Sequence, residues 1–347
     1  MDNMTDYNDN SPFVVNEKRH THDESFKKKV FDPKIYLNVK LAEDEKKRDV
    51  RIRILPANPG SRKISTDIRI HSMKVPTEVA KSGFKSFICL NDSHILGDER
   101  GCPFCNVFED YKTEAMKLKD PDGNVTNTTQ WKALWKEAYR HEAKIAHIVR
   151  VIDRDHEDEG VKFWRFNEWD NGKGCYDYLK EIYNLYNEEA ARKAYSAEYK
   201  KSPTSEQLAE YMKNDKGETR EFYNVFNLEN GHDIKLTLTH GENSKDRTEI
   251  KIMAELSESP LSYNENEVSK WVNDPKSWND AYAVKNYDYL EVVLNGGVPV
   301  YDPTVGKYVS KEEKERNEEE TEREAAEEVL NVMAPENGNT EDEDLPF

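Results

Sequence analysis

Three cysteines carry the clearest chemical signal in the sequence. Cys102 and Cys105 are separated by two residues, one of which is Pro103, and Cys89 lies upstream of them. A Cys-x-x-Cys turn presents two thiolates from one tight loop, and thiolates are preferred ligands of zinc. Structural zinc sites have four ligands, so one more is needed. The sequence therefore predicts a single zinc ion held by three sulfur atoms and a fourth side chain.

Two histidines compete for the fourth position. His94 lies close to Cys89, at a spacing that suits a pair of ligands from one loop. His71 ends a predicted strand, and a hairpin between that strand and residues 84–90 would bring it beside Cys89. Either choice gives four protein ligands and leaves no open coordination position, which is typical of a structural site and not of a catalytic one.

No other motif suggests catalysis. The sequence contains no nucleophile elbow, no glycine-rich phosphate loop and no H-E-x-x-H motif, so we do not expect an enzyme. Cys175 stands apart from the other three cysteines. A cysteine cluster of this spacing is typical of a metal site in a reducing compartment. The amino-terminal region has no signal-peptide pattern and no stretch is long and apolar enough for a membrane span, so we expect a cytoplasmic protein without membrane contact.

Charge is distributed unevenly along the chain. The protein has 347 residues and a net charge of -18, with 36% hydrophobic residues. Residues 311–347 alone carry a net charge of -11, so the remainder is only mildly acidic. Within that remainder, residues 48–90 contain nine basic and three acidic side chains. A local positive patch of this kind attracts polyanions regardless of the total charge.

The basic patch coincides with alternating strand patterns. In residues 49–55, Val50, Ile52 and Ile54 face one way, and Arg51 and Arg53 face the other. Residues 67–75 repeat the alternation. This period of two predicts half-buried strands whose exposed faces carry arginines. The patch provides these candidate DNA-binding residues: Arg51, Arg53, Arg69, Lys74 and Lys85.

Aromatic and basic residues also alternate further along the chain. Residues 144–153 and 161–169 read as two strands joined by an acidic turn. The second strand adds these candidate DNA-binding residues: Lys162, Trp164, Arg165 and Phe166. Upstream, residues 130–144 place Trp131, Trp135 and Tyr139 among lysines. Many of these rings must be buried, but exposed rings beside cations are what a single-stranded nucleic acid binder needs, because bases stack on them.

The remaining patterns define the rest of the fold. Residues 176–186 read as a helix, and Thr204 with Gln207 has the spacing of a capping box that begins another. Residues 232–240 and 248–256 are two more alternating strands. Ser310 with Glu313 predicts a helix in the charged carboxy-terminal region. Several strand pairs with few helices between them predict a mainly β (α+β) protein built on a small β-barrel.

In the order of these motifs, the chain resembles the single-stranded DNA-binding, or helix-destabilising, proteins of tailed bacteriophages. The matching segments are "RIRILP", "CPFC" after an upstream histidine and cysteine, "EGVKFWRF" followed by a helix, and the acidic tail. The resemblance implies an OB-fold-like five-stranded barrel with a zinc subdomain beside the DNA cleft. It favours His71 over His94 as the zinc ligand. It also implies that Arg53 contacts phosphates and that Arg165 and Phe166 lie in the cleft.

The expected organisation has three parts. Residues 1–45 are expected to form either a solvated linker or a flexible basic arm for nucleic acid or a neighbouring subunit, and the resemblance implies an arm for self-association along DNA. Residues 46–305 form the core. Within the core lie the zinc subdomain, at about 66–112, and a helical insertion, at about 186–222. Residues 306–347 form a disordered acidic tail.

The tail ends in an acidic block followed by a terminal aromatic residue, an arrangement suited to docking in a partner's pocket. The expected partners, by resemblance, are replication, recombination and repair enzymes of an infected bacterial cell. The predicted partner-binding residues are Asp342, Glu343, Asp344, Leu345, Pro346 and Phe347. The leading interpretation is thus sequence-nonspecific single-stranded DNA binding. The alternatives are a zinc-stabilised scaffold that recruits acidic partners and, with less support, a nuclease.

Overall fold

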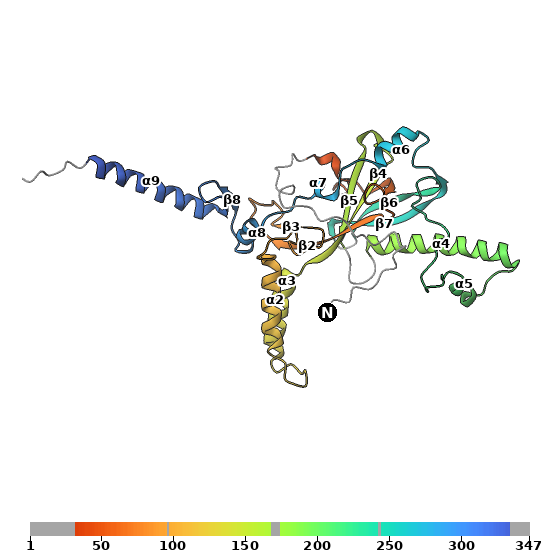
Figure 1. The fold of residues 1–347 in the computed structure, drawn as a ribbon, viewed down its shortest axis with the longest axis horizontal. Helices are drawn as coiled ribbons and strands as arrows, with labels where there is room; N and C mark the ends of the chain where they lie inside the picture. Colours follow the sequence, from red (N-terminus) through yellow and green to blue (C-terminus); the bar gives the residue numbers. More distant parts are fainter. Residues whose placement is uncertain (1–31, 96, 168–173, 242–243, 334–347) are drawn as a thin grey trace, which may run out of the picture. The chain divides into compact units, whose positions relative to one another are not determined.

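The structure is a computed structural model that describes residues 32–95, 97–167, 174–241 and 244–333; for residues 244–247 and 328–333 it describes the backbone alone (Figure 1). The chain divides into two compact units. In the described part, the first comprises residues 32–72 and 86–285, and the second comprises residues 73–85 and 286–333.

A seven-stranded sheet organises the first unit. The strand order is β3-β2-β4-β1-β6-β7, and β5 pairs with β4. The paired strands for which the register is resolved run antiparallel. The strands are β1 (Lys47–Leu55), β2 (Ser65–Lys74), β3 (Phe84–Ile88), β4 (Lys144–Asp153), β5 (Val161–Asn167), β6 (Gly231–Gly241) and β7 (Ser244–Ser259).

The alternating patterns form strands as predicted, but one face of β1 differs from expectation. Val50, Ile52 and Ile54 enter the main core. On the opposite face Arg51 is exposed, whereas Arg53 and Leu55 are fully buried. The prediction of an open arginine face is therefore wrong for Arg53. The second face is covered because Leu55 packs in another apolar cluster that includes Trp271 from α6 (Glu265–Val272).

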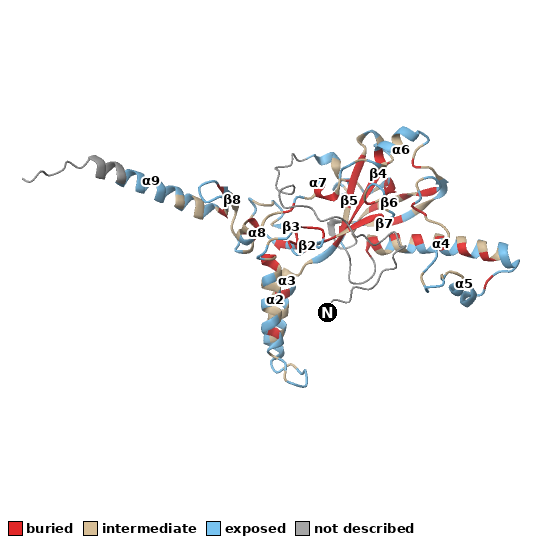
Figure 2. Cartoon of the chain, viewed as in Figure 1, coloured by how far each residue is buried: buried red, intermediate tan, exposed pale blue. Residues whose placement is uncertain are grey.

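Strand β4 is the centre of the sheet. One of its edges pairs with β5 along residues 146–152, and the other pairs with β2 at residues 144–149 and with β1 at residues 150–153. The acidic turn between β4 and β5 contains a short 3-10 helix, η2 (Glu157–Glu159). The predicted hairpin is thus confirmed. Figure 2 shows that the strands of this sheet carry much of the buried part of the unit.

A segment near the start of the described chain lies against β5. After the 3-10 helix η1 (Pro33–Ile35), the backbone N–H of Leu37 donates to the carbonyl of Phe163 at 3.0 Å. Leu37 itself is buried in the main core. Further on, the N–H of Leu41 donates to Oγ1 of Thr248 in β7 at 3.2 Å. Residues 37–41 therefore extend from β5 to β7 across the core.

Helices complete the first unit. Helix α4 buries side chains at helical spacing, and Tyr176, Leu179 and Tyr183 enter the main core. Its other buried residues are Asn187, Ala191 and Tyr195. The predicted capping box at Thr204 and Gln207 begins α5 and is confirmed. The helices are α2 (Pro103–Met116), α3 (Thr128–His141), α4 (Cys175–Tyr199), α5 (Ser205–Tyr211), α6 (Glu265–Val272) and α7 (Trp278–Ala281).

The second unit contains a helix, a hairpin and a long charged helix. Helix α8 (Tyr287–Leu294) buries Leu290 and Val293, and the hairpin of β8 (Pro299–Asp302) and β9 (Lys307–Ser310) follows. Helix α9 (Lys311–Met333) begins where Oγ of Ser310 accepts from the N–H of Glu313 at 3.1 Å, as the sequence predicts. Figure 2 shows that its described side chains are mostly exposed.

The fold is therefore α+β with a mostly antiparallel sheet, as the sequence indicates at this coarser level. A closed five-stranded barrel is not evident from the pairing of the described strands. Among the described helices, none has the length and apolar character needed to cross a membrane.

Candidate metal centre and the predicted DNA-binding residues

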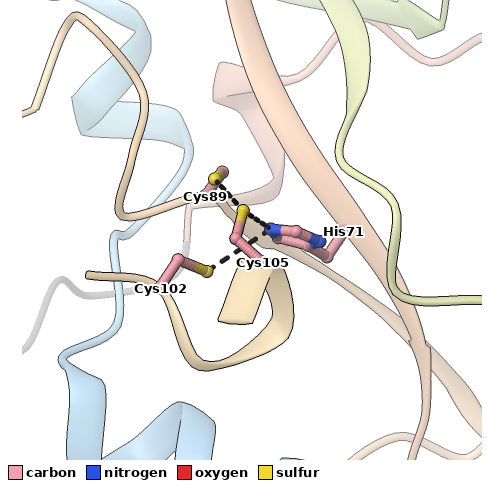
Figure 3. Close-up of side chains that lie close together, drawn as sticks. All are labelled: His71, Cys89, Cys102 and Cys105. Carbon is pink, nitrogen blue, oxygen red and sulfur yellow. Dashed lines mark hydrogen bonds between the residues drawn. The ribbon is translucent and has the colours of Figure 1, made fainter. Parts of the chain in front are cut away.

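Four side chains that can ligate a metal converge in the first unit. One ligand atom from each of His71, Cys89, Cys102 and Cys105 lies within 4.8 Å of all the others (Figure 3). Sγ of Cys89 is 3.4 Å from Sγ of Cys105, and Nε2 of His71 is 3.4 Å from Sγ of Cys102 and 3.6 Å from Sγ of Cys105. A disulfide needs about 2.05 Å between sulfurs. These cysteines are free thiols and their separations suit a shared metal ion.

The ligands come from elements that the local sequence fixes. His71 lies in β2, and Cys89 directly follows β3, the strand that pairs with β2. Cys102 is the N-cap of α2, with Pro103 at the first helical position, where its missing N–H costs no hydrogen bond. Cys105 therefore lies in the first turn of the helix. The predicted hairpin pairing is what brings the histidine and the cysteines together.

The orientation of His71 is set by the end of another helix. Its Nδ1 lies 2.8 Å from the carbonyl oxygen of His141, the last residue of α3. A carbonyl can only accept, so Nδ1 carries the proton and Nε2 presents its lone pair to the cysteines. Metal-bound histidines commonly have such a second partner. Helices α2 and α3 lie side by side (Figure 1), and the first turn of α2 and the last residue of α3 therefore meet at the candidate metal centre.

His94 is not part of the cluster, so the alternative ligand set is wrong. Its Nδ1 lies 2.8 Å from Oδ1 of Asp92, and its backbone N–H donates to the same oxygen at 2.8 Å. Both side chains are buried. His94 thus stabilises the turn that carries Cys89 instead of contributing a ligand.

Asp92 is a residue that the sequence reasoning missed. Its Oδ2 accepts from the backbone N–H of Arg69 at 2.5 Å, and the N–H of Cys89 donates to the carbonyl of Arg69 at 2.8 Å. Both backbone groups of Arg69 are therefore held by the segment that carries a metal ligand. The signal in the sequence is an Asp in a short turn just after a cysteine, because Asp side chains often bond to nearby backbone N–H groups.

The thiols influence one another's protonation. Hydrogen bonds from the thiols of Cys105 and Cys89 lower the pKa of Cys102, with a smaller contribution from His71. A hydrogen bond with Cys102 is the largest cause that raises the pKa of Cys89. Outside the cluster, burial raises the pKa of Cys175 to about 11, which keeps it a neutral thiol.

Arg53 is not placed to contact an external phosphate. Its side chain is fully buried, and it donates to the carbonyls of Asn227 at 2.9 Å and Ser259 at 2.5 Å. It also forms an ion pair with Asp233 at 3.4 Å. Burial is the largest of the causes that lower the pKa of Arg53 to about 10, which still leaves it charged at neutral pH. Its donors hold the end of β7, at Ser259, and the segment before β6, at Asn227.

The candidate DNA-binding residues of β5 are also mostly buried. Trp164 and Phe166 are buried in the main core. Lys162 is buried and pairs with Asp153 at 2.9 Å and Glu159 at 2.8 Å. Arg165 is half-buried, with its guanidinium 5.2 Å from the ring centre of Tyr282.

The strand register also separates the predicted cleft residues. Arg165 lies opposite Ile148, whereas Phe166 lies opposite His147. Because neighbouring residues of a strand point to opposite faces, Arg165 and Phe166 cannot line one surface of the sheet. The alternation of a strand already implies this separation, because Arg165 and Phe166 are adjacent in the sequence.

The remaining predicted cations vary in exposure. In the first unit, Arg51 is exposed and pairs with Asp155 at 3.1 Å, whereas Arg69 is exposed and forms no ion pair with a described acid. In the second unit, Lys74 is exposed and Lys85 is half-buried, and burial lowers the pKa of Lys85.

The aromatic residues of α3 differ from those of β5. Trp131 and Trp135 are half-buried, with ring centres 5.9 Å apart, and Tyr139 is 57% exposed and 5.3 Å from Trp135. Lys132 and Lys136, on the same helix, are exposed. An aromatic and basic surface is therefore present on α3, the upstream motif, instead of on β5.

The predicted tail-docking residues, Asp342 to Phe347, and the amino-terminal arm up to residue 31 lie outside the described residues. Comparison with known proteins adds no functional information. No protein-family model matches the chain, and no curated protein matches its sequence. Its own residues and their geometry are the basis on which its function has to be inferred.

Proposed function

We propose that this protein binds single-stranded DNA without sequence specificity and that a structural zinc ion holds part of its binding surface. The proposal also includes the OB-fold-like core and the relationship to tailed-bacteriophage single-stranded DNA-binding proteins that the sequence motifs suggest. One observation carries it: Arg69 is an exposed cation without a described acidic partner, and its backbone is fixed on both sides by the metal-binding segment.

The surroundings of Arg69 favour a nucleic acid ligand. Ile145 lies directly opposite Arg69 in the antiparallel pair of β2 and β4, on the same face of the sheet, and is 42% exposed. A guanidinium beside an exposed apolar side chain can contact a phosphate and a base together. Ile145 follows α3 closely in the chain, and α3 carries Tyr139 and the exposed lysines.

Zinc is the metal that fits the donor set best. Three thiolates and one imidazole nitrogen form a common tetrahedral structural zinc site, in which ligand atoms lie about 3.8 Å apart when zinc–sulfur bonds are 2.3 Å. The sulfur atoms of Cys89 and Cys105 are 3.4 Å apart, near that value. All four positions are taken by protein atoms, so the ion would stabilise the fold without activating water.

The strand arrangement is compatible with an OB-fold-like core. Five strands, β5, β4, β1, β6 and β7, form a continuous path, and residues 37–41 extend from the first of them to the last. A main core lies between them and α4. OB-folds bind oligonucleotides on one strand face of such a core and on the neighbouring loops. The acidic tail would then recruit replication and recombination enzymes.

A direct titration tests the proposal. Fluorescence anisotropy of a labelled oligo(dT) and of a duplex of equal length, each at two salt concentrations, should show preferential binding of the single strand and a loss of affinity as salt rises. Arg69→Ala should lower the affinity for oligo(dT) several-fold and reduce the salt dependence, since one phosphate contact contributes about 0.7 to the slope.

The matched control is Lys201→Ala, because Lys201 is also an exposed cation without a described acidic partner but lies after α4 and away from the metal centre. Equal losses in the two variants would mean that only general charge matters. No binding of oligo(dT) by the wild-type protein would overturn the proposed function and favour a zinc-stabilised scaffold.

A further inference from the structure

A polar cleft lies in the first unit, apart from the metal centre. Its volume is about 690 Å³. One wall is the connection between β1 and β2, which supplies Arg62 and Ile64, and the other is the segment before β6, which supplies Arg220, Asn224 and Phe226. These walls are more than 150 residues apart in the sequence, so sequence patterns could not reveal the cleft. Small-molecule sites commonly have volumes of about 300–1,000 Å³.

Arg62 provides a cation with no internal role. Its side chain is exposed, and it forms no hydrogen bond or ion pair with any residue in the described part of the chain. An arginine held in the fold usually donates to carbonyls or carboxylates, as Arg53 does. Arg62 therefore keeps all its donors available for a ligand.

Arg220 provides a second cation, and its position is fixed. Its guanidinium carbon lies 4.6 Å from the ring centre of Phe222 and 5.1 Å from that of Tyr211. One donor reaches the carbonyl of Tyr211 at 3.2 Å, and the carbonyl of Arg220 accepts from Asn187 at 3.0 Å. It has no ion pair with a described acid. Stacking on rings orients a planar guanidinium and leaves its remaining donors directed outward.

The rest of the cleft combines an apolar floor with polar groups. Ile64 and Phe226 are buried in the main core beneath it, and Ser61, Asn224 and Asn227 line its walls. The one acidic residue in the lining is Glu221, whose carboxylate already accepts from the hydroxyl of Tyr183 at 2.9 Å. Two cations against one engaged carboxylate give the cleft a positive balance.

We propose that this cleft binds a short stretch of a single DNA strand, with Arg62 contacting a backbone phosphate and Arg220 contacting a phosphate or stacking on a base. The inference rests on the proposed function and adds to it a second contact region, separate from the Arg69 surface. A phosphodiester fits the paired cations because guanidinium groups bind phosphate oxygens in a bidentate manner. A neutral apolar ligand would leave both charges without a partner.

Two substitutions in the full-length protein test the cleft. Arg62→Ala should weaken binding of oligo(dT) about threefold at low salt and reduce the salt slope by about 0.7, because it removes one phosphate contact. Arg220→Lys keeps the charge but loses the planar stack, and should weaken binding at least twofold. Lys270→Ala, an exposed lysine of α6 outside the cleft, is the matched control and should bind like the wild type. Melting temperatures verify folding.

Photochemical cross-linking locates the strand independently of affinity. An oligonucleotide that contains 5-iododeoxyuridine should cross-link to aromatic residues at the cleft, and peptide mass spectrometry should identify residues 211–228. If wild-type protein binds oligo(dT) but neither variant changes affinity and no cross-link falls in that segment, the cleft proposal is wrong and the proposed function stands. If the wild type does not bind oligo(dT), both are wrong.

Discussion

Arg53 and Arg69 lie on two strands, β1 and β2, that pair with the same neighbour, β4, and the sequence gives them the same alternating pattern. Arg53 is fully buried and donates to carbonyls of its own chain. Arg69 is exposed, and within the described residues its hydrogen bonds are made by its backbone. The difference arises outside the strands. The chain around Asn227 and Ser259 covers the side chain of Arg53 on β1, whereas no described acid pairs with Arg69 on β2. A basic residue on an alternating strand thus supports either folding or binding, depending on what packs over it.

Loss of the candidate metal centre should have the largest effect on stability and on DNA affinity. It would release the segment of Cys89 and Asp92, which holds the backbone of Arg69. Cys102→Ser should release the metal and lower the free energy of unfolding by several kcal/mol, since structural zinc contributes folding energy directly. Metal analysis and thermal unfolding measure both effects. Cys175→Ser is the matched control, as Cys175 is a free cysteine outside the cluster. A Cys102→Ser protein with a full equivalent of metal and unchanged melting would show that the cluster is not a metal site.

Arg53→Met should destabilise the fold by about 3–5 kcal/mol, because it leaves buried carbonyl acceptors and Asp233 with fewer donors. Denaturant unfolding measures this loss. The affinity of the remaining folded protein for oligo(dT) should not change. The comparison between the two arginines would fail if Arg53→Met were stable but could not bind DNA.

Comparison with Asp153→Asn should show that the Asp153 carboxylate contributes to the free energy of unfolding in a pH-dependent way. Burial by itself would raise the pKa of Asp153, but hydrogen bonds from Lys162 and His156 bring it below its ordinary value. Its contribution is therefore complete above the unfolded pKa of about 3.9 and is lost as the pH falls through the lower folded pKa. Urea unfolding should show a wild-type advantage of about 1–3 kcal/mol at pH 7 that shrinks below pH 4. A constant difference across this range would contradict the ion pair.

Arg69→Ala should have the smallest effect on stability, within about 0.5 kcal/mol, because its side chain is exposed and has no described acidic partner. Its effect should appear in DNA affinity alone. Unfolding and anisotropy measurements on one preparation separate the two quantities. A loss of stability similar to that of Arg53→Met would remove the distinction between these residues.

The candidate metal centre was largely predictable because its signal is local. Cys102 and Cys105 are set by one turn, and the spacing alone indicates their role. The choice between His71 and His94 was not local, since it depended on the pairing of β2 with β3 and on Asp92, which engages His94. Cysteine spacing therefore predicted three ligands, and strand pairing determined the fourth.

The predicted DNA-binding residues were less reliable because burial depends on distant segments. The alternating pattern made Lys162 a candidate for an exposed position. In the structure it is buried, and its charge is paired with the carboxylates of Asp153 and Glu159. Arg62 and Arg220 belong to no recognisable sequence motif, and only the fold brings them to the walls of one cleft. Alternation correctly predicted the strands themselves, since it reflects the pleat, but it did not predict what covers each face.

The contact between Leu37 and Phe163 has a consequence for solubility. Strand β5 contains "VKFWRFN", a segment rich in aromatic residues without proline or glycine, and within the described part of the chain β4 is its sole partner strand. The open edge of such a strand is a template for aggregation with other chains. Because the backbone of Leu37 bonds to Phe163, this short segment covers the edge at the third residue of β5. Residues near the start of the described chain thus protect the sheet against polymerisation through β5.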